Sequence, residues 1–152
     1  MSNEKLIYGY VEKATLIDKD LSLSAKLDTG AKSASLSAIN IHELVKNGKI
    51  YMCYIVPSKS GNIEFISEYI GKVRIKVRAG ESISINAKIA PIKRPVVLLK
   101  IKLGIKERLI RVNLTNRKRF NYPLLLGREA IKEFDGIIDP SMAFTLKSEK
   151  VE

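Results

Sequence analysis

The sequence predicts a mainly β protein, a small closed barrel or sandwich with one short helix near the C-terminus. Two observations indicate this fold class: many strand-length segments are separated by tight turn sequences, and only two stretches have helical character. This order of elements differs from that of a βαβ nucleotide-binding fold. The sequence also lacks a Gly-x-x-x-x-Gly-Lys loop, so we expect no phosphate cradle of that kind.

The segment 21–27 shows the strand pattern most clearly. Its apolar residues at every second position alternate with Ser22, Ser24 and Lys26, which is typical of a strand with one buried face. Similar runs predict further strands: Leu6 to Ile17, Ile50 to Val56, Ile63 to Ile70, Val73 to Val77, Ile83 to Ile89, Val96 to Leu103 and Leu109 to Leu114. Turn sequences separate several of them: Ser60-Gly61-Asn62, Ala79-Gly80-Glu81 and Leu103-Gly104-Ile105.

Two stretches are predicted to be helical. His42 to Lys46 is long enough for one turn, and Glu129 to Phe134 forms a short helix after Gly127-Arg128. The core must therefore come mostly from strands.

The length of 152 residues is typical of one compact domain, which we expect to span residues 1–152. Hydrophobic residues make up 45% of the chain and charged residues 28%, as in ordinary globular proteins. No window approaches the roughly 18 apolar residues of a membrane helix, and no signal-type run follows Met1. We therefore expect a cytoplasmic protein without a membrane partner.

The formal net charge is +11, from 27 Lys and Arg against 16 Asp and Glu. Such a surplus attracts anionic partners: nucleic acid, an anionic membrane or an acidic peptide. The basic residues are spread along the chain, with one short run at Arg117-Lys118-Arg119. Lysines that only solubilise strand surfaces are therefore an alternative explanation.

His42 is the only histidine and Cys53 the only cysteine. A catalytic triad would need His42 beside Cys53 or a serine, and nothing in the spacing supports such a pair. We expect an exposed or turn histidine and a cysteine that acts as a small buried apolar residue. One cysteine also excludes an internal disulfide and a zinc site built from several thiolates, and no tight carboxylate cluster replaces them. We therefore expect no metal and no other cofactor.

The segment Lys26-Leu27-Asp28-Thr29-Gly30-Ala31 places an aspartate at the end of a predicted strand. Asp28 falls on the polar side of the alternation, which directs its carboxylate away from the core. Thr29 can fix a tight loop by hydrogen bonds, and Gly30 lets the backbone pass close to whatever the carboxylate holds. A carboxylate that activates water needs this arrangement, although Asp-Thr-Gly is also a favourable turn sequence.

The segment Pro123-Leu124-Leu125-Leu126-Gly127-Arg128-Glu129 predicts a buried apolar strand, a glycine turn and the start of the late helix. On its own it is an ordinary strand-to-helix junction. An apolar strand ending in Asp-Thr-Gly-Ala, with a later Leu-Leu-Gly-Arg leading into a helix, resembles the two signatures of the retropepsins, the retroviral-type aspartic proteases. The resemblance implies a closed barrel of the acid-protease type.

Four motifs in order extend the resemblance over most of the chain: Asp28 to Ala38, Leu114 to Arg117, Leu125 to Ala130, and Ile138-Asp139-Pro140. Together they resemble a bacterial family named as ATP-dependent zinc proteases. That family is retropepsin-like in fold and is associated with RimK-type ATP-grasp ligases, which add glutamates to protein termini. One departure is Ser37, which stands where family members commonly carry a histidine.

The resemblance implies that Asp28 is the catalytic residue. It also implies an active-site loop and a supporting segment behind it: Thr29, Gly30 and Ala31; Leu126, Gly127 and Arg128. In this scheme Thr29 braces the loops of two copies across a dimer axis, Gly30 and Ala31 border the substrate backbone, and Arg128 is structural. Because the sequence has neither a nucleotide loop nor a zinc ligand set, we expect ATP and zinc to be dispensable.

An aspartic protease needs two aspartates that share one proton, because two like charges so close cannot both ionise. The charged carboxylate acts as base on a water while its protonated partner polarises the scissile carbonyl. This chain has one Asp-Thr-Gly, so the second aspartate must come from another copy. We therefore expect a C2 homodimer whose axis passes between two Asp28 side chains.

Retropepsins cover their cleft with a β-hairpin flap, for which the best candidate is Lys72 to Lys88 with its turn at Arg78-Ala79-Gly80-Glu81. Its expected substrate contacts are Lys76, Arg78 and Gly80. The alternative hairpin turns at Ser58 to Asn62. Positive charge on the first hairpin suits a glutamate-rich peptide, as the ligase association implies.

Two rival classes remain open. In the first, the barrel binds an acidic peptide without cleaving it, and Asp28 only closes a turn. In the second, a basic barrel binds RNA, with bases stacked on aromatic residues among the lysines. The aromatic residues considered for this role are Tyr8, Tyr10, Tyr51, Tyr54 and Phe65, for which core packing is the alternative, and we do not expect a nucleic-acid partner.

Overall fold

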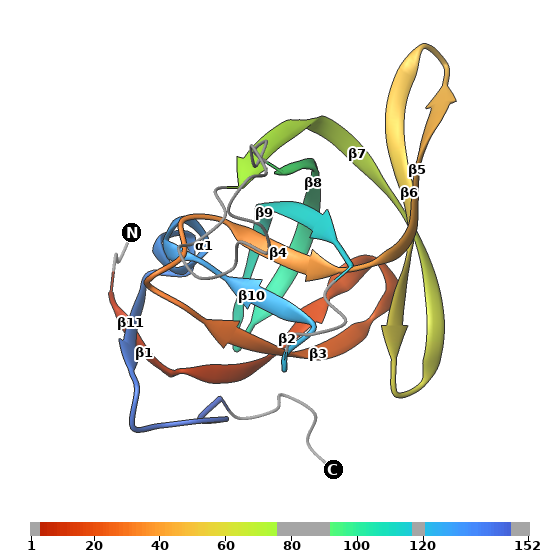
Figure 1. Ribbon diagram of the computed structural model, residues 1–152. Helices are drawn as coiled ribbons and strands as arrows, with labels where there is room; N and C mark the ends of the chain where they lie inside the picture. Colours follow the sequence, from red (N-terminus) through yellow and green to blue (C-terminus); the bar gives the residue numbers. More distant parts are fainter. Residues whose placement is uncertain (1–3, 76–91, 117–120, 147–152) are drawn as a thin grey trace, which may run out of the picture.

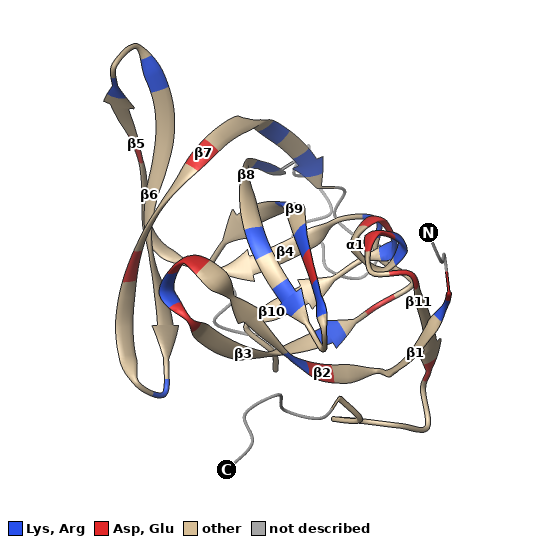
Figure 2. Cartoon of the chain, turned by 180° about the vertical axis from the view of Figure 1, so that it is seen from behind, with Lys and Arg blue, Asp and Glu red and all other residues tan. Residues whose placement is uncertain are grey.

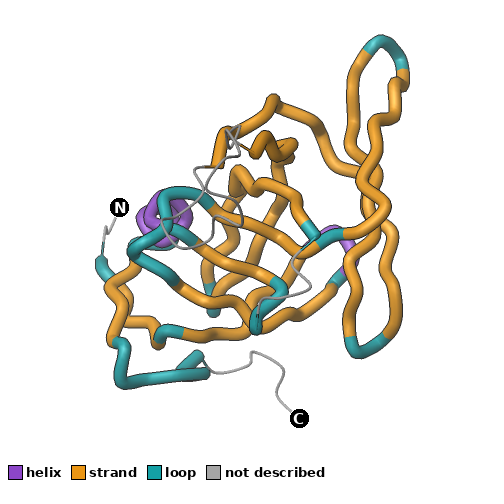
Figure 3. The backbone as a smooth tube through the Cα atoms, viewed as in Figure 1, coloured by secondary structure: helices purple, strands orange, loops and turns teal. Residues whose placement is uncertain are grey.

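Strands make up most of the fold, and six of them close into a barrel (Figure 1, Figure 3). The computed structural model describes residues 4–75, 92–116 and 121–146. The barrel order is β2 (Val11–Leu16), β3 (Leu21–Leu27), β10 (Leu124–Leu126), β4 (Ala34–Ser37), β9 (Lys106–Thr115) and β8 (Ile92–Leu103). A second pairing, between β8 and β2, closes the ring. The predicted closed β barrel is confirmed.

Three strands continue the sheet beyond β8 as an arm: β7 (Gly61–Ile75), β6 (Lys49–Ser58) and β5 (Ile39–Lys46). In Figure 1 the β5–β6 hairpin projects away from the barrel, and the β6–β7 turn lies at the other end of the arm. Two short strands, β1 (Leu6–Gly9) and β11 (Gly136–Asp139), form a separate parallel sheet. Within the described residues, no helix is long and apolar enough to cross a membrane.

The core is filled by side chains from alternate strand positions. In β3 the four apolar side chains are buried and lie between more exposed polar ones, as the alternation predicts. The arm contributes Tyr54 and Phe65, whose rings stack with centroids 5.5 Å apart. Burial of each large side chain stabilises the fold by about 1.5–3 kcal/mol, so these two residues anchor the arm to the barrel.

Most predicted elements are confirmed with small shifts. The strand at 21–27 has the predicted bounds, and the runs starting at Ile50, Val96 and Leu109 lie within β6, β8 and β9. The predicted late helix is α1 (Arg128–Glu133), which begins one residue earlier. The runs starting at Ile63 and Val73 join in β7, with an irregular register between Tyr69 and Gly71.

The predicted helical turn from His42 to Lys46 is wrong, because this stretch belongs to β5. The next two residues, Asn47 and Gly48, have φ angles of 52° and 74°. Two consecutive positive φ angles make the two-residue hairpin turn that matches the twist of paired strands. The Asn-Gly pair therefore commits the residues before it to a strand that pairs with β6.

The predicted strand from Leu6 to Ile17 is divided into β1, β2 and a 3-10 turn at Ile17–Lys19. The chain bends at Tyr10, whose amide donates to the Met142 carbonyl at 2.9 Å. A Cβ on Gly9 would lie 2.4 Å from that oxygen, so only glycine allows this close approach. The division thus depends on a contact with a segment far along the chain.

Candidate active site

Asp28 follows directly after β3, at the edge of the barrel. Its amide donates to the Leu126 carbonyl in β10 at 2.9 Å. Its carboxylate Oδ1 accepts a hydrogen bond from the Gly30 amide at 2.8 Å. The Asp28 residue is half-exposed, so solvent reaches its carboxylate. The buried strand before it and the hydrogen bond from Gly30 fix its position.

A tight turn follows Asp28. The Ala31 amide donates to the Asp28 carbonyl at 3.2 Å, which closes a four-residue turn. Thr29 and Gly30 are exposed at its corner. A Cβ on Gly30 would lie 3.0 Å from Asp28 Oδ1, so a side chain there would crowd the carboxylate.

Strand β10 lies behind this loop. It is inserted between β3 and β4, which the loop 28–33 connects. Leu126 pairs with Leu27 in the parallel direction, and Leu124 pairs with Leu36 in the antiparallel direction. The loop is thereby fixed at both ends to one strand.

The residues after β10 pack directly against the loop backbone. A Cβ on Gly127 would lie 2.6 Å from the Ser33 carbonyl oxygen and 2.8 Å from that of Ala31. The Arg128 amide donates to the Ala31 carbonyl at 2.7 Å, and the Arg128 guanidinium donates to the Thr29 carbonyl at 3.1 Å. One backbone donor and one side-chain donor at the start of α1 therefore fix the turn.

Asn113 in β9 is a further support that the sequence did not reveal. Its side chain is buried, and Nδ2 donates to the Ala34 carbonyl at 2.8 Å and to Ser33 Oγ at 3.3 Å. Its Oδ1 accepts from Arg94 at 3.3 Å. One signal was available: Asn113 is the only polar uncharged residue in the predicted strand from Leu109 to Leu114.

The structure brings the predicted loop and the predicted supporting segment into contact. The predicted flap contacts Lys76, Arg78 and Gly80, and the strand from Ile83 to Ile89, lie outside the described residues. The base of that hairpin is described, with Ile75 paired to Ile92 across β7 and β8.

The alternative hairpin at Ser58 to Asn62 forms the β6–β7 turn, where Ser58 Oγ donates to the Gly61 carbonyl at 2.7 Å. Ser37, at the position of the family histidine, is half-buried at the end of β4. Its amide donates to the Pro123 carbonyl at 2.7 Å.

His42 and Cys53 are register partners across β5 and β6, a proximity that the sequence spacing did not suggest. His42 is exposed, with Nδ1 2.8 Å from the Asn40 carbonyl, and Cys53 is half-buried rather than buried. Both lie on the arm and not in the Asp28 loop. In the described ranges, no group of three or more His, Cys, Asp or Glu side chains could hold a metal ion.

The five aromatic residues considered for base stacking do not form one surface. Tyr8, Tyr54 and Phe65 are buried, whereas Tyr10 is 41% exposed and Tyr51 is half-buried. Burial raises the pKa of Tyr8 to about 12, and its hydroxyl donates to the Phe134 carbonyl at 2.9 Å. Three of the five therefore act as core residues.

Comparison with known proteins assigns the chain to a family. A family model described as the retropepsin-like aspartic endopeptidase RimB matches residues 7–149. The chain belongs to the RimB-like family. The retropepsin part of the resemblance is thus confirmed, and the family is described as one of aspartic endopeptidases. The name ATP-dependent zinc protease is not confirmed.

Two relatives named probable alpha-L-glutamate ligase, from Shewanella pealeana and Shewanella halifaxensis, are each 30% identical over 151 residues. The matches cover 96% of this RimB-like chain but 31% of each relative's length. A solved structure of protein Lpg0085 from Legionella pneumophila, described as having unknown function, is 60% identical with a TM-score of 0.82. That match covers 95% of this chain and 100% of the other, and it supports the barrel fold.

Proposed function

We propose that this protein is an aspartic endopeptidase in which Asp28 residues from two copies activate one water. The observation that carries the proposal is the Asp28 loop itself. A half-exposed carboxylate, oriented by the Gly30 amide at 2.8 Å, stands at the end of a buried strand in a member of a family described as aspartic endopeptidases.

A homodimer would supply the second carboxylate. Each chain has a single Asp-Thr-Gly, and the exposed corner at Thr29 and Gly30 leaves the loop open to meet its symmetry mate. In such a dimer the two carboxylates share one proton. The charged one takes a proton from water, and the protonated one donates a hydrogen bond to the scissile carbonyl. Thr29 would brace the two loops, and Gly30 and Ala31 would border the substrate backbone.

Two observations support an acidic peptide as substrate. The chain carries a net charge of +11. In the Shewanella relatives, a region similar to this chain belongs to a protein named as a glutamate ligase. We propose that the hydrolase acts on glutamate-rich peptides and is functionally linked to such a ligase.

The direct test is the Asp28→Asn variant, with Asp20→Asn as a matched change in an exposed turn. Asp28→Asn should keep the dimer and lower turnover of a glutamate-rich peptide by about a thousandfold or more, because only a carboxylate can take the proton from water. Asp20→Asn should leave turnover unchanged. Cleavage by Asp28→Asn at the wild-type rate would show that the catalytic assignment is wrong.

Metal and nucleotide dependence test a separate part of the proposal. Because the two carboxylates activate the water, exhaustive chelation without added nucleotide should leave the rate of peptide cleavage unchanged. The measurement is kcat/KM before and after chelation. Strict dependence on a metal ion would contradict this mechanism.

A further inference from the structure

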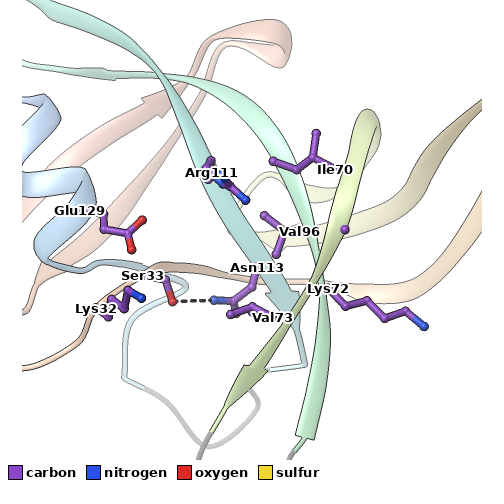
Figure 4. A pocket seen from close by; sticks show the side chains of 10 residues that line it. Lys32, Ser33, Ile70, Lys72, Val73, Val96, Arg111, Asn113 and Glu129 are labelled. Atoms are coloured by element: carbon purple, nitrogen blue, oxygen red, sulfur yellow. Dashed lines mark hydrogen bonds between the residues drawn. The ribbon is translucent and has the colours of Figure 1, made fainter.

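A cavity of about 310 Å³ lies beside the Asp28 loop (Figure 4). Its walls come from the loop, from β7, β8 and β9, and from the start of α1. The lining residues that matter chemically are Lys32, Ser33, Val96, Arg111, Asn113 and Glu129. We refer to this cavity as the basic pocket.

One side of the basic pocket is aliphatic. Ile70, Val73 and Val96 line it, and Val96 is the cross-strand partner of both Gly71 and Asn113. A Cβ on Gly71 would meet nothing within 4 Å, so the backbone leaves this side open. Such a surface can contact the methylene groups of a ligand side chain.

The charged lining is mainly cationic. Lys32, Lys72 and Arg111 stand against one carboxylate, that of Glu129. Within the described part of the chain, none of the three cations forms an ion pair with a carboxylate. In Figure 4 Lys72 reaches away from the other labelled side chains, whereas Arg111 and Lys32 lie on the side of Glu129. Lys32 and Arg111 are therefore the cations placed to attract an anion.

Ser33 adds a neutral donor. Its hydroxyl oxygen accepts a hydrogen bond from Asn113 Nδ2 at 3.3 Å, shown as the dashed line in Figure 4. A hydroxyl that accepts in this way still has its own proton to donate. Asn113 is buried and also bonded to Ala34 and Arg94, so it orients Ser33 and takes no ligand itself.

The basic pocket is close to Asp28 along the chain. The turn that joins Asp28 to Ala31 keeps their Cα atoms within about 7 Å, and Lys32 is the next residue, so its Cα lies within about 11 Å of the Asp28 Cα. An extended peptide covers that distance in about three residues. A substrate cleaved at Asp28 can therefore place a side chain in the pocket.

We propose that the basic pocket is a specificity subsite that binds a glutamate side chain of the substrate, about three residues from the scissile bond. The methylene groups contact Val96 and Ile70, and the carboxylate interacts with Lys32, Arg111 and the Ser33 hydroxyl. This inference rests on the proposed function, in which the substrate backbone binds at Asp28 to Ala31. The preference for glutamate is assigned to other residues, Lys32, Ser33 and Arg111.

The test measures peptide binding separately from cleavage. Fluorescein-labelled hexaglutamate and hexaglutamine peptides are titrated into full-length protein that carries Asp28→Asn, and fluorescence anisotropy gives the dissociation constants. A further Arg111→Gln change should weaken hexaglutamate binding roughly fivefold, the value of one partly exposed ion pair, and leave hexaglutamine binding unchanged. Arg111→Lys should restore part of the loss.

Glu129→Gln should change the affinity for hexaglutamate in the opposite direction from Arg111→Gln. Removal of the one carboxylate should tighten hexaglutamate binding, an effect that damage to the fold could not produce. Lys46→Gln, at the exposed end of β5, removes the same charge from the arm and should change binding less than about twofold. Equal losses for Arg111→Gln and Lys46→Gln, or weaker binding by Glu129→Gln, would overturn the subsite.

Cleavage by protein with an intact Asp28 distinguishes the two proposals. If hexaglutamate is not cleaved but binding still depends on Arg111 and Glu129, the subsite stands and the proposed hydrolysis fails. If hexaglutamate is cleaved and kcat/KM is the same in the Arg111→Gln protein, the hydrolysis stands and the subsite fails.

Discussion

Gly127 illustrates how one residue shapes the candidate site. Its φ of −84° and ψ of −172° suit any residue, so only its neighbours exclude a side chain. A Cβ would lie 2.6 Å from the Ser33 carbonyl oxygen, in backbone that cannot move without displacing the Asp28 loop. The requirement for glycine is therefore steric.

Gly127→Ala should lower the free energy of unfolding by about 1–3 kcal/mol and reduce peptide cleavage, because the loop must shift. Gly48→Ala is a useful control, since its Cβ would meet nothing within 4 Å and only its φ of 74° is unfavourable. The control should lower the free energy of unfolding by about 1 kcal/mol and leave the rate of peptide cleavage unchanged. Thermal denaturation and kcat/KM measure both effects, and an unchanged rate for Gly127→Ala would contradict loop support.

Asp135 is a second residue with a measurable role, at the end of α1. The hydrogen bond from Lys106, 2.6 Å from its Oδ2, lowers the pKa of Asp135 below its usual value of 3.8. Arg108 lies 3.8 Å from the same oxygen. A lowered pKa in the folded protein means that the ionised form stabilises the fold above pH 3.8, and that this stability is lost as the pH falls through the folded-state pKa.

Asp135→Asn should therefore be less stable than wild type near neutral pH, with a difference that shrinks below pH 3.8. Urea unfolding at several pH values measures it. In a double-mutant cycle with Lys106→Gln, the two changes should be less than additive, because each removes the same pair. A stability difference that does not change with pH would contradict the assigned cause.

At the scale of elements, a buried carboxylate, that of Glu12 in β2, binds the chain at Thr145 and Leu146. Glu12 accepts hydrogen bonds from the Thr145 amide at 2.8 Å, the Thr145 hydroxyl at 2.6 Å and the Leu146 amide at 3.2 Å. It also accepts one from the Gly9 amide at 2.7 Å. Four donors aimed at one carboxylate leave no place for an additional donor.

Glu12→Gln should lower the free energy of unfolding by about 2 kcal/mol. The NH2 group of the new amide would face hydrogen-bond donors, so at least one donor would lose its acceptor. Hydrogen exchange should then speed up most at Thr145 and Leu146. Glu43→Gln, on an exposed strand position, should show neither effect. Unchanged exchange in Glu12→Gln would contradict its role as a clamp.

Local sequence patterns predicted the strands that have one buried face and the elements that begin at a recognisable turn sequence. The alternation in β3 and the apolar run before Gly127 led to the Asp28 loop and its support. β4 was missed because three of its four residues are buried, which removes the alternation. β5 was mistaken for a helical turn because Asn47-Gly48 was not treated as a hairpin turn.

The remaining features of the site depend on contacts between distant residues. Asn113 touches Ser33 across 80 positions of sequence, and the basic pocket combines the loop with three strands and α1. No local pattern encodes such an assembly, because the register of β4 against β9 decides it.

For the whole molecule, the charge distribution bears on substrate preference. Figure 2 shows Lys and Arg along β7, β8 and β9, together with acidic residues on β7 and β9, and charges of both signs at α1. If this field attracts acidic peptides, raising the salt from about 0.05 M to about 0.5 M should increase KM for hexaglutamate far more than for a neutral peptide. Equal salt dependence for both peptides would indicate that the +11 charge only keeps the protein in solution.

The central claim is that two copies of the chain share one catalytic centre. A heterodimer with one wild-type and one Asp28→Asn subunit, purified through two different tags, tests it most directly. Because each centre needs both carboxylates, this heterodimer should have essentially no turnover, whereas independent subunits would give about half the wild-type rate. Half-activity of the heterodimer, or full activity of a monomer, would contradict the account.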